Sequence, residues 1–121
     1  MQNNMSEYEL FFEIFTPMGF HVRVTVSYWK LIVTVKHPVM SGQEQLVKEV
    51  LENPDEIRRS RSDSDVYLFY KLDQRKRWIC AIARRLNGDG FLITTYPTDA
   101  IDFQILNFTR PEGGIRVSHT L

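Results

Sequence analysis

Three β-forming segments in the second half of the chain constrain its fold more than any other feature. They are rich in β-branched and aromatic residues, and two short polar connections suited to hairpins, DQRK and LNGDG, join them. The segments are Asp65–Leu72, Arg77–Arg85 and Gly90–Pro97. The middle one contains WICAIA, which is apolar on both faces. We therefore predict an antiparallel meander in which the middle segment is the central, most covered strand.

The N-terminal residues are predicted to form a β-hairpin. The aromatic-rich YELFFEIF, residues 8–15, is followed by TPMG, a typical turn sequence, and then by FHVRVTV, residues 20–26. FHVRVTV alternates strictly between apolar and polar residues, as expected of a half-buried strand. The apolar side consists of Phe20, Val22, Val24 and Val26, and the polar side of His21, Arg23 and Thr25.

Two helices are predicted between the hairpin and the meander. Apolar residues near helical spacing favour a first helix, which must end at His37 because Pro38 disfavours a helical conformation in the residue before it. Ser41 and Glu44 have the spacing of a capping box that begins a second helix, and Pro54 ends it near residue 53. The apolar stripe of the second helix consists of Leu46, Val47, Val50 and Leu51.

Together these elements predict one α+β domain. The expected architecture is an N-terminal β-hairpin with one or two helices packed on a twisted antiparallel β-sheet. A chain of 121 residues is long enough to bury one hydrophobic core without a metal or a disulfide. We assign residues 1–106 to this domain and expect residues 107–121 to form a polar C-terminal tail, a disordered one by its Gly- and Pro-containing composition.

Composition excludes several classes of protein and site. No apolar run approaches the roughly 20 residues that span a bilayer, and no basic residue precedes the first apolar run, so we expect a cytoplasmic protein with no membrane partner. Cys80 is the only cysteine, and the three histidines have no metal-ligand spacing. No phosphate-binding or dinucleotide-binding motif is present. The sequence therefore predicts neither a metal nor a cofactor.

The neutral net charge hides a basic segment in the middle of the chain. Residues 58–85 contain nine basic and three acidic residues, a net charge of +6, whereas residues 1–57 carry −4 and residues 86–121 carry −2. A local excess of this kind attracts a polyanion even at neutral overall charge, because screening limits each charge to its near surroundings. The alternative is that several of these residues are solvated strand ends.

Polar residues at strand ends around the basic segment suit cleavage of RNA without a metal. That reaction needs a group that takes the proton of the 2′-hydroxyl, cations at the phosphate and an acid for the leaving oxygen. Histidine suits proton transfer near neutral pH, and arginine binds phosphate with two donors. The candidate residues are His37, Arg58, Arg61, Lys71, Arg84, Thr94 and Tyr96. Strand alternation places Thr94 and Tyr96 on one face, and it allows only one of Arg84 and Arg85 to point into any cleft.

The order of these motifs resembles a known nuclease family. A Trp lies shortly before KHPVM, a helix ends in NPDEI, a strand contains VYLFYK, a hydrophobic strand ends in Arg, and NGDGFLITTYPTD follows. Over residues 29–99 this series resembles the phage-associated nucleases of the Barnase, EndoU, colicin and RelE-like (BECR) superfamily. After TTYPTD the chain departs from the family pattern, which usually ends in a short segment containing Lys, Glu and an aromatic residue.

The resemblance implies an α+β fold and metal-independent endoribonuclease activity that leaves a 2′,3′-cyclic phosphate. Carried over by position, His37 would be the general acid or base, and Thr94 and Tyr96 would orient the phosphate or the histidine. The cations it implies at or near the reacting phosphate are Arg61, Lys71 and Arg84, with Arg58, Arg59 and Arg85 as further phosphate-binding residues.

The resemblance also implies partners. Members of the family are often toxins, so RNA and an antitoxin or immunity protein are the expected partners. Two alternatives stay open at this point. The chain could be a non-catalytic module that binds nucleic acid or protein, or it could itself be the acidic partner of a toxin. His37 marks the end of a helix in either case, and the alternative is that this is its only role.

Overall fold

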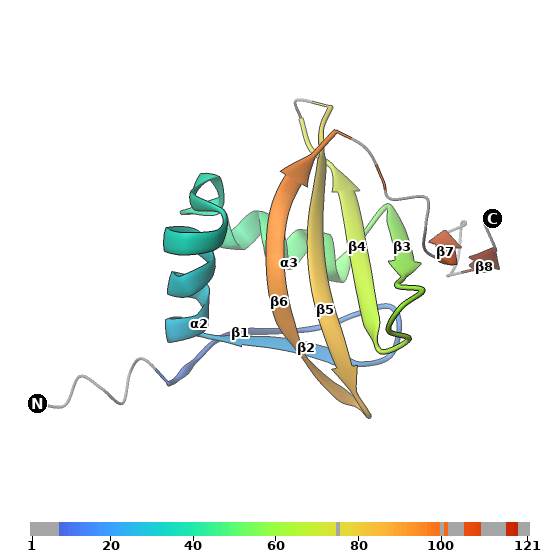
Figure 1. The fold of residues 1–121 in the computed structure, drawn as a ribbon, viewed down its shortest axis with the longest axis horizontal. Helices are drawn as coiled ribbons and strands as arrows, with labels where there is room; N and C mark the ends of the chain where they lie inside the picture. Colours follow the sequence, from blue (N-terminus) through green and yellow to red (C-terminus); the bar gives the residue numbers. More distant parts are fainter. Residues whose placement is uncertain (1–7, 75, 100, 102–105, 110–115, 119–121) are drawn as a thin grey trace, which may run out of the picture.

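The structure is a computed structural model, and it describes residues 8–74, 76–99, 101, 106–109 and 116–118. It confirms the α+β class: helices pack on a mixed β-sheet (Figure 1). Among the described residues, eight strands form this sheet in the order β1-β2-β6-β5-β4-β3-β7-β8.

The predicted hairpin and meander are both present. Strands β1 (Leu10–Phe15) and β2 (His21–Thr25) pair antiparallel, with Phe12 opposite Val24. Strands β4 (Val66–Leu72), β5 (Trp78–Leu86) and β6 (Asp89–Thr98) form the antiparallel meander. Strand β5 lies between the other two, as the doubly apolar WICAIA predicted.

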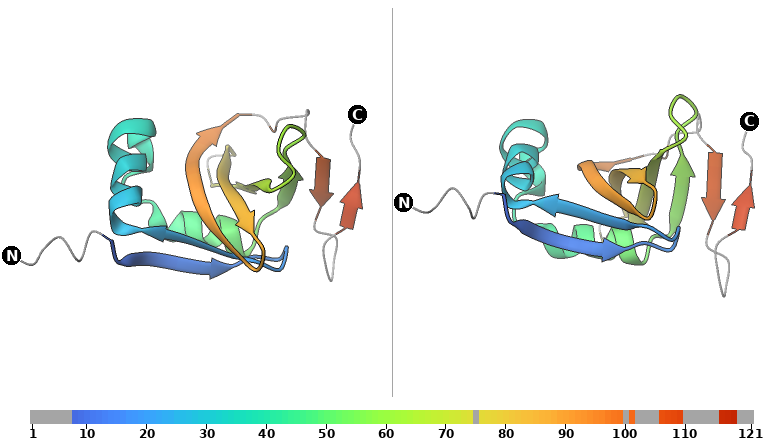
Figure 2. Two further views of the ribbon diagram at one scale, coloured as in Figure 1. Left: turned by 60° about the horizontal axis from the view of Figure 1, so that its bottom comes forward. Right: turned by 90° about the horizontal axis from the view of Figure 1, so that it is seen from below.

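The expectation of a purely antiparallel sheet was wrong at one junction. Strand β2 pairs parallel with β6, through Arg23 opposite Phe91, and so joins the hairpin to the meander. Figures 1 and 2 show the hairpin running across the other strands at a steep angle instead of continuing their direction. This crossing explains why the parallel contact is short.

The first predicted helix is present, but its second half is wound more loosely than an α-helix. Helix α2 (Val26–Leu31) begins at Thr25, whose hydroxyl accepts from the N–H of Tyr28. It continues as the π-helical segment η1 (Ile32–Lys36), and the chain leaves helical geometry at His37, as Pro38 predicted. The short 3₁₀ segment η2 (Pro38–Met40) follows.

Helix α3 (Glu44–Glu52) ends at Asn53 as predicted, but its predicted start was wrong. The residue that caps its N-terminus is Gln43, which makes no side-chain capping bond, and Ser41 instead follows η2 with an extended backbone. Gly42 adopts a φ of +79°, a conformation that glycine reaches without strain, and this turn separates Ser41 from the helix.

The main hydrophobic core lies between the helices and one face of the sheet. Helix α3 buries Val47, Val50 and Leu51 in it, and α3 contacts β1 as well as β4 and β5, so it fills the space inside the curve of the sheet (Figure 2). A smaller cluster covers the opposite sheet face. It contains Leu68, Tyr70, Cys80 and Ile101.

Strand β3 (Glu56–Arg59) was not predicted, because the acidic and basic letters EIRR do not alternate with apolar residues. It pairs with β4 on one side and with β7 (Leu106–Thr109) on the other. Strand β7 pairs in turn with β8 (Arg116–Ser118), and the rest of the predicted tail, residues 110–115 and 119–121, lies outside the described residues.

Candidate functional site

The segment that carries His37 is fastened to strand β6. The Lys36 Nζ donates to the Tyr28 hydroxyl at 3.0 Å and to the Ile93 carbonyl at 3.2 Å, and the Tyr28 hydroxyl donates to the same carbonyl at 2.7 Å. Ile93 lies at an irregularity in the pairing of β6 with β5, between the pairs Ile82–Thr94 and Ala83–Leu92. The bulge turns this carbonyl toward the helix, and the position of His37 follows from that anchor.

His37 contacts Tyr96 directly. The ring centroids are 5.1 Å apart at an interplanar angle of 41°, and both side chains are half-buried. The backbone of His37 is held as well: its N–H donates to the Ile32 carbonyl at 2.7 Å, and its carbonyl accepts from the Met40 N–H at 2.9 Å. An imidazole fixed at both its backbone and its ring loses little entropy on meeting a substrate.

Thr94 lies two residues before Tyr96 and shares its sheet face, since the two residues pair with Ile82 and Cys80 of β5. Within the described part of the chain, the Thr94 Oγ1 is buried and has no hydrogen-bond partner. A buried hydroxyl without a partner costs roughly 1–3 kcal/mol, and a ligand group that reached it would recover this cost. His37, Thr94 and Tyr96 are thus the predicted site residues that the structure brings together, and we call them the β6 site.

Two predicted cations on the same sheet face are already paired with acids. Arg58 is only 4% exposed and donates to the Glu56 Oε2 at 2.8 Å. Arg84 donates to the Asp63 Oδ2. Arg58 lies in one row with Thr94, but Leu68 and Ile82 separate them, so their backbones are about 14 Å apart.

Arg59 and Arg85 meet in a pocket on the helix side of the sheet. The pocket has a volume of about 310 Å³ and is lined by Arg59, Ser64, Asp65, Tyr67, Arg85 and Asn87. The Arg59 guanidinium lies 5.1 Å from the Tyr67 ring centroid and donates to its hydroxyl at 2.6 Å, while the Arg85 guanidinium lies 5.6 Å from the Phe20 ring centroid. Two guanidinium groups and one carboxylate give this arginine pocket a positive charge.

The remaining predicted cations lie elsewhere. Lys71 donates to the Asn53 carbonyl at 2.9 Å and lies 3.8 Å from Asp55, at the edge of a second pocket of about 480 Å³ at the opposite end of β4. Arg61 is exposed in the loop between β3 and β4. The prediction that only one of Arg84 and Arg85 points into a cleft agrees with their placement on opposite sheet faces.

Both distance and the sheet itself separate the β6 site from the arginine pocket, because Thr94 and Tyr96 lie on the face of Arg84 and the pocket lies on the opposite, helix side. Arg85 pairs with Gly90, and Tyr96 lies six residues further along β6, which is about 20 Å. One phosphate group cannot touch both. A strand of RNA that reaches from one to the other must span several nucleotides.

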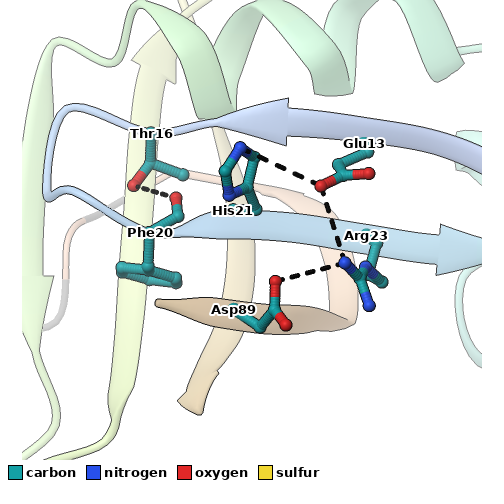
Figure 3. Close-up of polar contacts among 6 residues, drawn as sticks. All are labelled: Glu13, Thr16, Phe20, His21, Arg23 and Asp89. Atoms are coloured by element: carbon teal, nitrogen blue, oxygen red, sulfur yellow. Dashed lines mark hydrogen bonds and ion pairs between the residues drawn. The ribbon is translucent and has the colours of Figure 1, made fainter. Parts of the chain in front are cut away.

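A further polar cluster, which the sequence did not predict, lies on the outer face of the hairpin (Figure 3). The Glu13 Oε2 lies 4.0 Å from the His21 Nε2 and 3.7 Å from the Arg23 Nη2, and the Arg23 Nη2 donates to the Asp89 Oδ1 at 3.1 Å. The alternation of FHVRVTV did place His21 and Arg23 on one polar side. The alternation could not predict Asp89, because only the parallel pairing of β2 with β6 brings Asp89 close to Arg23.

Asp63 provides a test of the pairing with Arg84. A hydrogen bond from the backbone N–H of Asp65 is the main cause that lowers the pKa of Asp63, and the guanidinium of Arg84 lowers it further. Because its pKa is lowered in the folded state, ionised Asp63 stabilises the folded protein. This contribution is complete above the ordinary pKa of 3.8 and is lost as the pH falls through the lowered pKa. We expect Arg84→Gln to raise the pKa of Asp63 part of the way toward 3.8, because the Asp65 bond remains. Carboxyl NMR titration measures this, and Arg85→Gln, on the opposite sheet face, is the control that should leave it unchanged.

In the described residues we find no helix with both the length and the apolar character needed to cross a bilayer. No family model matches the chain, and neither a curated protein nor a solved structure does so. The resemblance to the BECR nucleases therefore stays a prediction that rests on the motifs of this sequence alone.

Proposed function

We propose that this protein is a metal-independent endoribonuclease of the BECR, RelE-like type that acts in the cytoplasm as the toxin of a toxin–antitoxin or phage-related system. The observation that carries the proposal is the contact of the His37 ring with Tyr96, on the sheet face that also carries Thr94, whose hydroxyl has no hydrogen-bond partner among the described residues. These three groups supply proton transfer, orientation and a hydrogen-bond donor in one place.

The chemistry that follows needs only these groups, an RNA strand and water. His37 takes the proton of a 2′-hydroxyl, the 2′-oxygen attacks phosphorus, and the bond to the 5′-oxygen breaks as that oxygen takes a proton from water. The products are a 2′,3′-cyclic phosphate and a 5′-hydroxyl. Thr94 donates a hydrogen bond to a phosphate oxygen, and Tyr96 holds the imidazole ring in place. The arginine pocket binds the RNA backbone several nucleotides away.

The test is cleavage of total RNA by the purified protein in the presence of EDTA, followed by sequencing of the new ends. Removal of a general acid or base typically costs 100-fold or more, so His37→Gln is expected to lower the rate by at least about 100-fold. His21→Gln is the matched control, because it removes the same chemical group from the outer face of the hairpin. In cells, expression of the wild type should arrest growth and His37→Gln should restore it. Absence of cleavage by the wild type at any protein concentration refutes the nuclease proposal.

The arginine pocket favours a second candidate function, a module that binds RNA without cutting it. Two guanidinium groups line one pocket there, whereas Arg58 and Arg84, on the same sheet face as the β6 site, are paired with carboxylates. For such a module, the affinity for RNA falls steeply with salt and drops in the double variant Arg59→Gln, Arg85→Gln. His37→Gln then changes neither binding nor growth. A nuclease instead retains RNA binding in His37→Gln while it loses cleavage, so the two functions are distinguishable.

A further inference from the structure

We propose that Glu13, His21 and Asp89 form a binding site for a divalent transition-metal ion of the Zn²⁺ type, on the outer face of the hairpin. This inference is independent of the proposed ribonuclease activity, which needs no metal. The sequence predicted no metal site because its three histidines are far apart, but two carboxylates supply the other ligands here.

Three different strands bring the ligand atoms together. Glu13 comes from β1, His21 from β2 and Asp89 from β6, and one ligand atom of each lies within 4.8 Å of the others. Tetrahedral Zn²⁺ with bonds of about 2.0–2.2 Å needs ligand atoms roughly 3.4 Å apart. The His21 Nε2 and Glu13 Oε2 are already 4.0 Å apart, so small rotamer changes of exposed side chains complete the site.

The positions of His21 and Asp89 are set by packing and backbone contacts. The His21 ring lies against the Phe15 ring, with centroids 4.8 Å apart. The backbone N–H of His21 donates to the Gly88 carbonyl at 3.1 Å, which holds β2 against the turn that carries Asp89. The ligands are therefore fixed by the fold, and only their side-chain ends need to move.

Arg23 occupies the place of the cation in the structure. Its Nη2 lies 3.1 Å from the Asp89 Oδ1 and 3.7 Å from the Glu13 Oε2, so its charge compensates the two carboxylates (Figure 3). The Arg23 side chain is 47% exposed, so it can turn into solvent when a metal ion takes over this compensation. Arg23 thus competes with a metal ion for the two carboxylates, so its removal is expected to raise the affinity for the metal.

The ligand set selects the class of metal. One imidazole nitrogen and two carboxylate oxygens suit Zn²⁺, Co²⁺ and Ni²⁺, whereas Ca²⁺ and Mg²⁺ prefer oxygen ligands alone. Three protein ligands also leave a coordination position open to solvent. We therefore expect saturable binding of Zn²⁺ and Co²⁺ and no comparable binding of Ca²⁺.

The experiment is a titration of the purified, EDTA-stripped full chain with Zn²⁺ against a chromophoric chelator, repeated with Co²⁺ by visible absorption. We expect one ion per chain, an affinity at least about tenfold weaker in His21→Gln, Glu13→Gln and Asp89→Asn, and no change in the matched control His37→Gln. Arg23→Gln should bind Zn²⁺ severalfold more tightly, because the competing cation is gone.

Three results would overturn the proposal. They are no stoichiometric binding by the wild type, equal binding by His21→Gln and the wild type, and weaker binding by Arg23→Gln. All these residues are partly or fully exposed, and far-ultraviolet circular dichroism of each variant verifies that it is folded.

Discussion

Gly90→Ala is expected to lower the free energy of unfolding by more than about 3 kcal/mol. A Cβ atom at position 90 would lie 2.6 Å from the Arg84 carbonyl oxygen, 2.8 Å from the His21 carbonyl oxygen and 2.9 Å from the Phe20 ring. Two of these three neighbours are backbone atoms of strands that pair around residue 90, so they cannot move without breaking the sheet. Small domains are stabilised by only about 5–15 kcal/mol in total, so this single methyl group removes a large part of the margin.

Gly88→Ala is the control for this prediction. A Cβ at position 88 would meet no atom within 4 Å, and neither glycine has a positive φ, so the two substitutions differ mainly in the available space. Urea unfolding followed by tryptophan fluorescence gives both free energies. A loss for Gly90→Ala that is no greater than that for Gly88→Ala would show that β2 and β6 do not approach each other this closely.

Glu56→Gln is expected to lower the free energy of unfolding by about 3 kcal/mol. The Arg58 guanidinium beside it is almost completely buried, and the side chain of Glu56 is itself only 19% exposed. Removal of the carboxylate charge leaves a cation in a medium that solvates it poorly, and this cost exceeds the value of the pair itself. The double variant Glu56→Gln, Arg58→Met should recover part of the loss, because it removes the buried charge as well.

Asp55→Asn is the matched control. Asp55 is the residue before Glu56, and its ion pair with Lys71 is more exposed than the pair of Glu56 with Arg58. Exposed pairs contribute only about 0–1 kcal/mol, so we expect a correspondingly small change. Chemical denaturation of the four proteins gives the comparison. Equal losses for Glu56→Gln and Asp55→Asn would mean that water reaches the Arg58 guanidinium.

The elements that could be predicted from the sequence are those whose signal is local. The meander follows from β-forming segments joined by short turns, and the end of η1 at His37 follows from Pro38 alone. The start of α3 was misplaced because the spacing of Ser41 and Glu44 fits a capping box, whereas the turn at Gly42 removes Ser41 from the helix. The parallel contact of β2 with β6 joins residues far apart in the chain, and no local pattern carries it.

In the candidate site, too, the features with a local sequence signal were predicted and those that depend on tertiary contacts were not. Thr94 and Tyr96 were placed on one face by strand alternation, and the helix end at His37 was correctly located, so the β6 site could be anticipated in part. The cations could not be assigned, because their availability depends on the acidic neighbours that the fold turns toward each of them. Arg58 looked like a phosphate ligand in the sequence, yet EIRR forms a strand that turns it inward against Glu56.

The position of β6 between β2 and β5 has a consequence for the protein as it leaves the ribosome. The strands on either side of β6 are synthesised before it, so in a nascent chain that ends before Asp89 the edges of β2 and β5 that later pair with β6 have open hydrogen-bonding groups. Closing the contact of Arg23 with Phe91 also requires a loop of more than 60 residues to be ordered, and such long-range pairing is slow. The hairpin and the meander therefore join into one sheet only after β6 has been synthesised. Until then each growing chain exposes strand edges with which neighbouring chains can pair.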